Sequence, residues 1–190
     1  DFDTISYINI DTNYFSETFT LDQSYFTDFS VKMLNDVLLV ASGWSKRNSS
    51  NSYVKTTLTY GNAPEDLAYD STNNEYFVCN DVTNTVFCYD GTTLAYKRNF
   101  TINGSGAHFI AVDSAAGELY VVQDSNVRVY NTTDTGTPTQ KRSIFGGAIS
   151  DNVKGIHVDT SYYFITRNTS PDYVETRNKT NGNLVRRITA

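Results

Sequence analysis

The chain consists of short runs of β-favouring residues separated by clusters of Asn, Asp, Gly and Ser. The 14 Tyr and 11 Phe, together with abundant Thr, are typical of strands. Apolar residues spaced three and four apart over a dozen positions, as in an amphipathic helix, do not recur convincingly. The pattern therefore predicts an all-β protein made of short strands and tight turns.

The strand pattern also repeats along the chain. Asp70, Asp113 and Asp159 each close the first strand of a copy and lie 43 and 46 residues apart. A weaker copy precedes them. A repeat of roughly 40 to 50 residues that holds four strands is typical of one blade of a β-propeller. The expected strands are 28–32, 37–42 and 52–60 in the weaker copy, 66–70, 75–80, 85–91 and 95–102 in the next, 109–113, 118–123, 126–131 and 140–145 in the third, and 155–159, 162–166, 173–178 and 183–188 in the last.

We therefore expect a β-propeller or partial propeller with about four blades of four antiparallel strands, preceded by an N-terminal strand pair at 5–10 and 14–20. Closed propellers take roughly 4 to 8 blades. The chain is then a small closed ring with an N-terminal addition, an arc that a partner or self-association completes, or a fragment of a larger propeller. We favour the arc, which leaves apolar faces open at both ends. The expected divisions are 1–20 for the strand pair and about 21–60, 61–104, 105–150 and 151–190 for the blades.

The repeat resembles the NHL-type six-bladed propellers and the related surface propellers of bacteria and archaea. Residues 110–113, 119–122, 126–130 and 142–146 match, in order, the four strand patterns of such a blade, and 155–159 and 181–188 resemble it too. The resemblance covers roughly residues 63–190. The resemblance implies the fold but says little about function, because the family includes scaffolds, binding modules and a few enzymes.

Charge and hydrophobicity exclude two classes of partner. The net charge is −6, and no cluster of Lys or Arg exceeds two residues, which argues against nucleic acids and anionic membranes. The longest apolar run, Val37 to Ala41, is far shorter than the roughly 20 residues of a membrane span. The chain opens at Asp1 without a methionine, so we expect that a signal peptide has been removed or that the piece comes from something longer.

Cys79 and Cys88 flank a tight connection at 81–84. A register that places residue 79 opposite residue 88 puts the two sulfurs on one face of a hairpin, and we predict a cross-strand disulfide. The alternative is two half-buried thiols. A zinc site is not expected, because no second cysteine pair and no histidine lie nearby in the sequence.

Six Asn-x-Ser/Thr sequons occur, although chance alone would give about four. Most fall in expected turns or at strand ends, whereas Asn99 lies in an outermost strand. With the possible disulfide and the missing methionine, they predict an extracellular or cell-surface glycoprotein. The candidate glycosylation sites are Asn48, Asn99, Asn103, Asn131, Asn168 and Asn178.

Glu65, His108 and Lys154 occupy one position, just before or at the start of the first strand, in three successive copies. In a propeller this position lines the mouth of the channel, so the three side chains form a candidate site for a polar ligand. The alternative is an ordinary solvated rim. His157 lies inside a first strand, and we expect it to be packed in the core. The aspartates that recur at positions 70, 113 and 159 are expected to accept hydrogen bonds from the turn that follows each.

We find no catalytic constellation and predict no catalytic residue, metal or cofactor. The predicted function is binding or extracellular assembly, with a protein or a carbohydrate at the surface as partner, or with self-association or a completing chain. One alternative is a propeller hydrolase or lyase with a metal in the central channel. Another is a subunit of an extracellular filament or coat whose N-terminal strands complete a neighbour's sheet.

Overall fold

The computed structural model is all-β, with four sheets of four strands and one strand pair, as the sequence predicts. Side chains are described from residue 64 onward. The described residues are 4–9, 14–20, 31–34, 37–40, 43–47, 53–57, 64–104, 106–123, 126–144, 153–167 and 171–189.

Each four-stranded sheet is an antiparallel meander, which we number as blades 1 to 4. Blade 1 is β3 to β6 (Val31–Leu34, Val37–Val40, Gly43–Arg47, Tyr53–Thr57). Blade 2 is β7 to β10 (Pro64–Asp70, Glu75–Asn80, Thr85–Asp90, Tyr96–Thr101). Blade 3 is β11 to β14 (Phe109–Asp113, Glu118–Val122, Val127–Asn131, Arg142–Ile144), and blade 4 is β15 to β18 (Val153–Val158, Tyr162–Arg167, Tyr173–Asn178, Leu184–Thr189).

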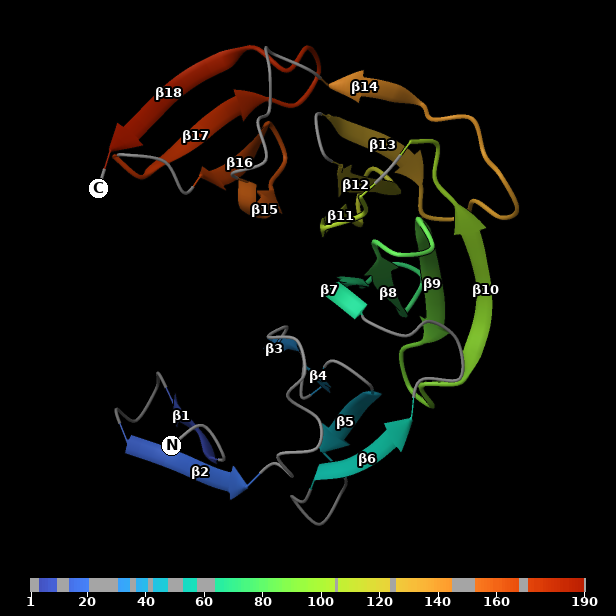
Figure 1. The fold of residues 1–190 in the computed structure, drawn as a ribbon, viewed down its shortest axis with the longest axis vertical. Coiled ribbons are helices and arrows are strands. Elements are labelled where there is room, and N and C mark those ends of the chain that lie inside the picture. Colours follow the sequence, from blue (N-terminus) through green and yellow to red (C-terminus); the bar gives the residue numbers. More distant parts are fainter. Residues whose placement is uncertain are drawn as a thin grey trace.

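The blades follow one another around an arc, with the first strand of each nearest the centre and the last at the rim (Figure 1). The pair β1 (Thr4–Asn9) and β2 (Tyr14–Thr20) extends the arc beyond blade 1, and the arc is open between this pair and blade 4. The structure is therefore a partial propeller. In the described part of the chain, no helix is long and apolar enough to cross a membrane.

Two apolar clusters fill the spaces between successive blades. One joins Phe77 and Val86 of blade 2 to Ile110 and Leu119 of blade 3. The next joins blade 3 to Tyr163 and Ile165 of blade 4. A third covers the other face of blade 2. Blades 2 and 3 thus bury both faces, and blade 4 buries the face toward blade 3. This burial is the main source of stability in a repeat of small sheets.

The recurring aspartates hold the turns after the first strands, as predicted. Asp70 Oδ1 accepts hydrogen bonds from the backbone N–H groups of Thr72 and Asn73, at 3.0 and 3.4 Å. Asp113 accepts one from Ala116 at 3.1 Å, and Asp159 accepts two of 2.7 Å. A short carboxylate side chain often accepts such hydrogen bonds from the N–H groups of a turn, in place of a backbone carbonyl.

The structure corrects two details of the predicted strands. In blade 1 the third strand is 43–47, which the sequence pattern did not reveal, and 53–57 is the fourth. In blade 2 the β8–β9 ladder pairs Cys79 with Val86 and Phe77 with Cys88, two residues away from the expected register. The turn at 81–84 is as expected, with Asn84 at φ 50°.

Candidate functional site: the open face of blade 4

The three predicted channel-mouth residues lie at the starts of three neighbouring inner strands. Glu65 and Lys154 are the extra residues of β-bulges, at the register shifts in the β7–β8 and β15–β16 ladders. His108 immediately precedes β11, and its backbone N–H donates to the carbonyl of Val122 at 3.0 Å. A bulge redirects a side chain away from the regular alternation of a strand. The part of the chain with described side chains contains no group of three His, Cys, Asp or Glu suited to a metal.

Blade 4 differs from blades 2 and 3 in that one of its faces has no neighbouring sheet among the described strands. Tyr163 and Ile165 of β16 point toward blade 3. Side chains along a strand alternate between the two faces of the sheet, so the residues adjacent to Tyr163 and Ile165 point away from blade 3. We call this side the open face. It carries His157, Tyr162, Phe164, Thr166, Val174, Thr176, Arg186 and Ile188, which are cross-strand partners or alternate neighbours in the ladders of the blade.

Each of these positions has a counterpart in blades 2 and 3, where the side chain is buried or half-buried. Phe77 and Tyr120 correspond to Phe164, and both are fully buried. Phe100 and Ile144 correspond to Ile188, which is 49% exposed. Blade 4 therefore retains Phe164, Val174 and Ile188 as apolar groups at positions where the repeat ordinarily packs against a further sheet.

His157 is exposed, which corrects the expectation of a packed histidine. Its counterparts Ala68 and Ala111 are buried in the spaces between blades. The sequence pattern of a first strand is the same in all three copies, but burial depends on whether a neighbour follows. Among the residues with described side chains, His157 has no such neighbour on its side of blade 4.

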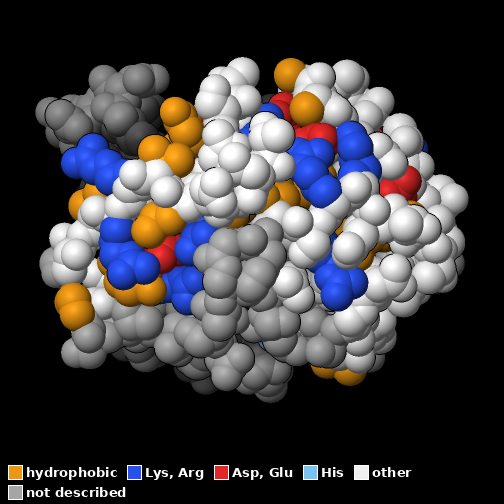
Figure 2. All heavy atoms as spheres, turned by 90° about the horizontal axis from the view of Figure 1, so that it is seen from above, with side chains coloured by type: hydrophobic (Ala, Val, Ile, Leu, Met, Phe, Trp, Pro, Cys, Tyr) orange, Lys and Arg blue, Asp and Glu red, His pale blue; other side chains and the backbone are white. Residues whose placement is uncertain are grey.

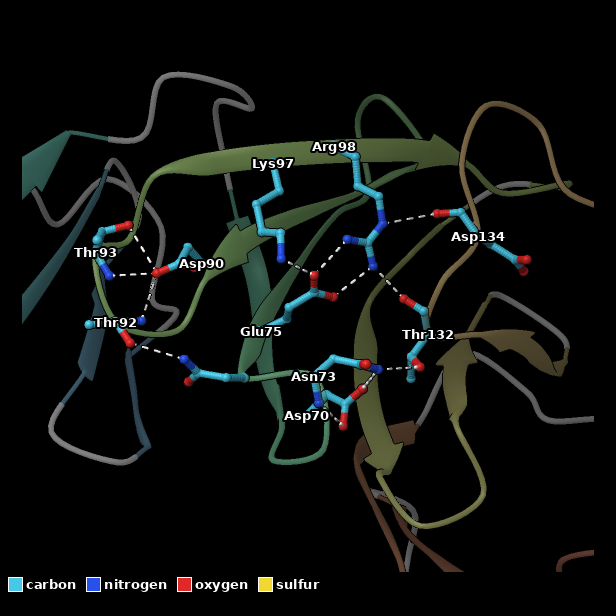
Figure 3. A network of polar contacts seen from close by, with 11 residues as sticks. Asp70, Asn73, Glu75, Asp90, Thr92, Thr93, Lys97, Arg98, Thr132 and Asp134 are labelled. Carbon is cyan, nitrogen blue, oxygen red and sulfur yellow. Dashed lines mark hydrogen bonds and ion pairs between the residues drawn. The ribbon is translucent and has the colours of Figure 1, made fainter.

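A buried ion pair marks the same face in blades 2 and 3. In blade 3, Arg142 donates two hydrogen bonds of 2.7 Å to the two carboxylate oxygens of Glu118. In blade 2, Arg98 donates to Glu75 in the same way, at 2.8 and 2.7 Å. Figure 3 shows Glu75 between Lys97 and Arg98, with the guanidinium also reaching the carbonyls of Thr132 and Asp134 in blade 3.

These arginines hold the carboxylates in their charged form. The hydrogen bonds from Arg142 are the main reason that the pKa of Glu118 falls to about 2. Burial on its own would raise the pKa of Glu75, but the hydrogen bonds from Arg98 and Lys97 outweigh it and lower that pKa to about 2 as well. This pair was not predicted from the sequence, although Glu75 and Glu118 recur 43 residues apart and Arg98 and Arg142 recur 44 apart.

In blade 4 only the basic half of the pair remains. Arg186 stands opposite Thr176, as Arg142 stands opposite Val129, and Tyr162 occupies the place of the glutamate. Tyr162 is 37% exposed. Arg186 is exposed, and its side chain makes no hydrogen bond or ion pair with the described residues. The open face is therefore an apolar surface that carries one arginine without its carboxylate.

A hollow of about 390 Å³ lies at one end of the open face, where β15, β16, β17 and β18 come together. Lys154, which the sequence analysis singled out, lines this hollow with Arg167, Val174 and Ile188. Beside it, Arg187 lies 4.2 Å from the ring centre of Tyr173. Figure 2, which looks onto the outer edge of the molecule, shows Lys and Arg side chains gathered with hydrophobic ones. Asp172 also lines the hollow, so its lining combines apolar side chains with charges of both signs.

Glu175 binds two arginine side chains at this end of blade 4. It is buried and accepts hydrogen bonds from Arg177 at 2.8 Å and from Arg187 at 2.7 Å. Burial would raise its pKa, but these two arginines outweigh burial and lower it. Glu175 faces the same way as Ile165, toward blade 3, so it is not available to neutralise the open face.

The cysteines are both buried and not joined in a disulfide, which corrects the predicted bond. In the observed register they are diagonal neighbours, Cys79 being opposite Val86 and Cys88 opposite Phe77. Diagonal Cβ atoms in a ladder lie roughly 7 to 8 Å apart. A disulfide requires the two Cβ atoms to lie about 3.8 Å apart, so this register does not allow the bond.

The predicted glycosylation sites differ in how their side-chain amides are used. Asn103 is exposed. The amide nitrogen of Asn99 donates to the Tyr96 hydroxyl at 3.0 Å, and that of Asn131 donates to Asp134 at 3.1 Å. In Asn178 the side-chain oxygen accepts from the turn that follows. Asn48 and Asn168 lie outside the described residues.

Comparison with known proteins supports the fold and no family. No family model matches the chain, and no curated protein sequence matches it. Among solved structures, a chain of hydrazine synthase from Kuenenia stuttgartiensis is similar over 84% of this chain, with a TM-score of 0.64 and 14% sequence identity. This chain spans about half, 48%, of the length of that one. At this identity the similarity concerns the all-β fold alone.

Proposed function

We propose that the chain is a secreted or cell-surface, glycosylated propeller module of NHL-like type, which acts by binding or assembly and not by catalysis. Binding belongs, in this proposal, to the open face of blade 4. The observation that carries it is the contrast between Ile144, which is 1% exposed, and its counterpart Ile188, which is 49% exposed. A repeat that keeps an apolar residue at such a position leaves a surface suited to a second sheet or protein.

The chemistry of the open face favours a macromolecule over a substrate. Its side chains are apolar, threonine, one histidine and one arginine, with no nucleophile placed beside a base among these described residues. The hollow next to it is open and lined by residues of four strands. Phe164, Val174 and Ile188 offer a broad contact area, which fits a protein partner better than a small molecule.

The test is site-specific photo-crosslinking in the cells that produce the protein. A photoreactive side chain at Ile188 is expected to give an adduct with one identified protein. The matched control is Val82, which is 73% exposed but lies in the β8–β9 turn, away from the open face. The same adducts at both positions, or none at Ile188, would overturn the assignment of binding to this face.

Location is tested separately through the sequons. The proposal of an extracellular protein now rests on them, because the thiols form no disulfide. Glycopeptide mass spectrometry of protein from its natural source is expected to find a glycan at Asn103, the exposed site with an uncommitted side chain, and lower occupancy at Asn99 and Asn131. Protein bare at every sequon would contradict the extracellular part of the proposal.

A further inference from the structure

The hollow at the end of blade 4 is lined by a buried arginine with unused hydrogen-bond donors. The side chain of Arg167 is 5% exposed, and it donates no hydrogen bond to a described residue. Its ion pair with Glu175 is long, at 3.6 Å. Arg177, which is about as buried in the same blade, donates to Glu175 at 2.8 Å and to the carbonyl of Gly182 at 2.9 Å. A guanidinium carries five N–H donors, so Arg167 retains donors for a further acceptor.

Glu175 does not satisfy Arg167, because two other arginines hold its carboxylate. Arg177 donates to one carboxylate oxygen, and Arg187 donates to the other at 2.7 Å. The ring of Tyr173 gives Arg167 a weaker contact, with the guanidinium carbon 6.0 Å from the ring centre. Tyr173 also lines the hollow, so the guanidinium lies near its wall. Buried charges in proteins are ordinarily paired and hydrogen-bonded, and an anion in the hollow would supply what Arg167 lacks.

The repeat does not require an arginine at this position. The counterparts of Arg167 are Asn80 at the end of β8 and Gln123 directly after β12, and both are buried neutral amides. Asn80 accepts a hydrogen bond from the backbone N–H of Thr83 at 3.0 Å. Gln123 donates one to the carbonyl of Asn103 at 2.9 Å. Blade 4 thus carries a charge without hydrogen bonds where the other blades have a hydrogen-bonded amide.

Lys154 brings a second cation to the hollow, at the position where blades 2 and 3 hold Glu65 and His108. It lies at the bulge in the β15–β16 ladder. Its side chain is exposed and makes no hydrogen bond or ion pair with the described residues. Asp172 is the only acidic residue among the described residues of the lining, and it makes an interaction of its own. The two cations outnumber this carboxylate, so the hollow favours an anion.

The rest of the lining favours a carboxylate that is carried on a side chain. A planar guanidinium matches a carboxylate with two parallel hydrogen bonds, as Arg142 does with Glu118. Val174 and Ile188 line the same hollow and offer apolar contacts to methylene groups. A volume of about 390 Å³ accommodates a whole side chain and not only a small ion.

We infer that the hollow binds an acidic side chain of the protein partner, with its carboxylate between Arg167 and Lys154 and its methylene groups against Val174 and Ile188. The hollow adjoins the open face, so one partner reaches both surfaces. The inference rests on the proposed function, because it names the chemical group by which the partner of that face is recognised.

The test is a titration of the isotope-labelled full chain, followed by NMR through the Nε–H signals of arginine and the backbone amides. The probe is glutamate capped by acetyl and methylamide groups, and capped glutamine is its neutral isostere. Capped glutamate should shift the Nε–H signal of Arg167 and the amides of Val174 and Ile188, with half-saturation at roughly millimolar concentration. Capped glutamine should give no saturable shift, and the same shifts from it would overturn the inference.

Inorganic phosphate separates a carboxylate site from a general anion site. It should bind more weakly than capped glutamate, because it makes no contact with Val174 and Ile188. Phosphate that binds as tightly as capped glutamate would overturn the assignment to an acidic side chain.

Two variants test the residues that hold the carboxylate. Arg167→Gln introduces the residue that blade 3 has at this position and should weaken the binding of capped glutamate at least about tenfold. Lys154→Gln changes an exposed side chain and should weaken it by about threefold. Lys141→Gln, which removes a cation from blade 3, is the control and should bind as the wild type does. Unchanged binding by Arg167→Gln would overturn the inference, and if that variant does not fold, unchanged binding by Lys154→Gln would do so.

This inference and the proposed function fail in different ways. An adduct from a photoreactive side chain at Ile188, without binding of capped glutamate, would overturn the carboxylate site and leave the proposed function standing. Binding of capped glutamate without any adduct at Ile188 would support the carboxylate site and contradict the assignment of a protein partner to this face.

Discussion

Glu118 and Arg142 face each other across blade 3 with two parallel hydrogen bonds of 2.7 Å. The side chain of Glu118 is 8% exposed. Removal of its charge leaves a guanidinium in a largely covered site without its partner, which is costly. We expect Glu118→Gln to lower the free energy of unfolding by about 3 kcal/mol in urea titrations.

The control for this variant is Lys141→Met. Lys141 also contacts Glu118, at 3.0 Å, and is about as exposed as Arg142, but it donates a single hydrogen bond where Arg142 donates two in parallel. Ion pairs of this kind contribute less than about 1 kcal/mol. If both substitutions cost the same, Glu118 and Arg142 are not the pair that stabilises the blade.

The acid stability of the fold is expected to depend on Glu75 and Glu118. Arg98 and Arg142 hold the pKa of each at about 2 in the folded state, below the ordinary value of 4.5. The unfolded chain therefore binds more protons between these values, so both groups stabilise the fold above pH 4.5 and lose this contribution as the pH falls toward 2. Urea midpoints measured from about pH 6 down to about 2 should fall steeply below about pH 5.

The double variant Glu75→Gln, Glu118→Gln provides the comparison for this pH dependence. It is less stable at neutral pH, but its midpoint should change less over the same acidic range, since two of the titrating groups are gone. An unchanged slope would show that other carboxylates control the acid transition.

Cys88 is expected to be inert in the folded protein. Burial, with the nearby Glu75 as a smaller cause, raises its pKa to about 12. The thiolate is the reactive form, so alkylation of Cys88 by iodoacetamide at about pH 8 should be very slow until urea unfolds the chain. Mass spectrometry of trapped peptides measures this directly. A Cys79–Cys88 disulfide in the purified protein would contradict the observed register.

The pair Ile144 and Ile188 tests whether the last blade really lacks a neighbour. Ile144→Ala removes a buried side chain from the space between blades 3 and 4 and should cost about 2 to 4 kcal/mol. Ile188→Ala, in the equivalent strand position, should cost less than about 1 kcal/mol in the dilute monomer. Equal losses would mean that the face of blade 4 is already covered within one chain.

Much of this architecture could be predicted from the sequence. The turn aspartates and the alternation of strands are local features, and Asp70, Asp113 and Asp159 identified three blades on that basis. The cysteine register was missed because a shift of two residues leaves the same side chains on the same face, so the pattern of Cys79 and Cys88 does not distinguish the two pairings.

Burial was harder to predict than secondary structure. His157 occupies a strand position that is covered in the other copies, and only the arrangement of the blades shows that no described sheet follows it. Arg186 presents the same problem. It repeats Arg98 and Arg142 in sequence, but the loss of its carboxylate becomes visible only when the register places Tyr162 at the position of the glutamate.

The most direct test of the account is hydroxyl-radical footprinting of Ile188 and Tyr162 as a function of protein concentration, with Val82 as the internal reference. Because we propose that the open face is the surface used for binding, labelling of Ile188 and Tyr162 should fall when the protein is assembled, while Val82 keeps its reactivity. Ile188 and Tyr162 that remain as reactive in the assembled state as in the dilute monomer would contradict the claim.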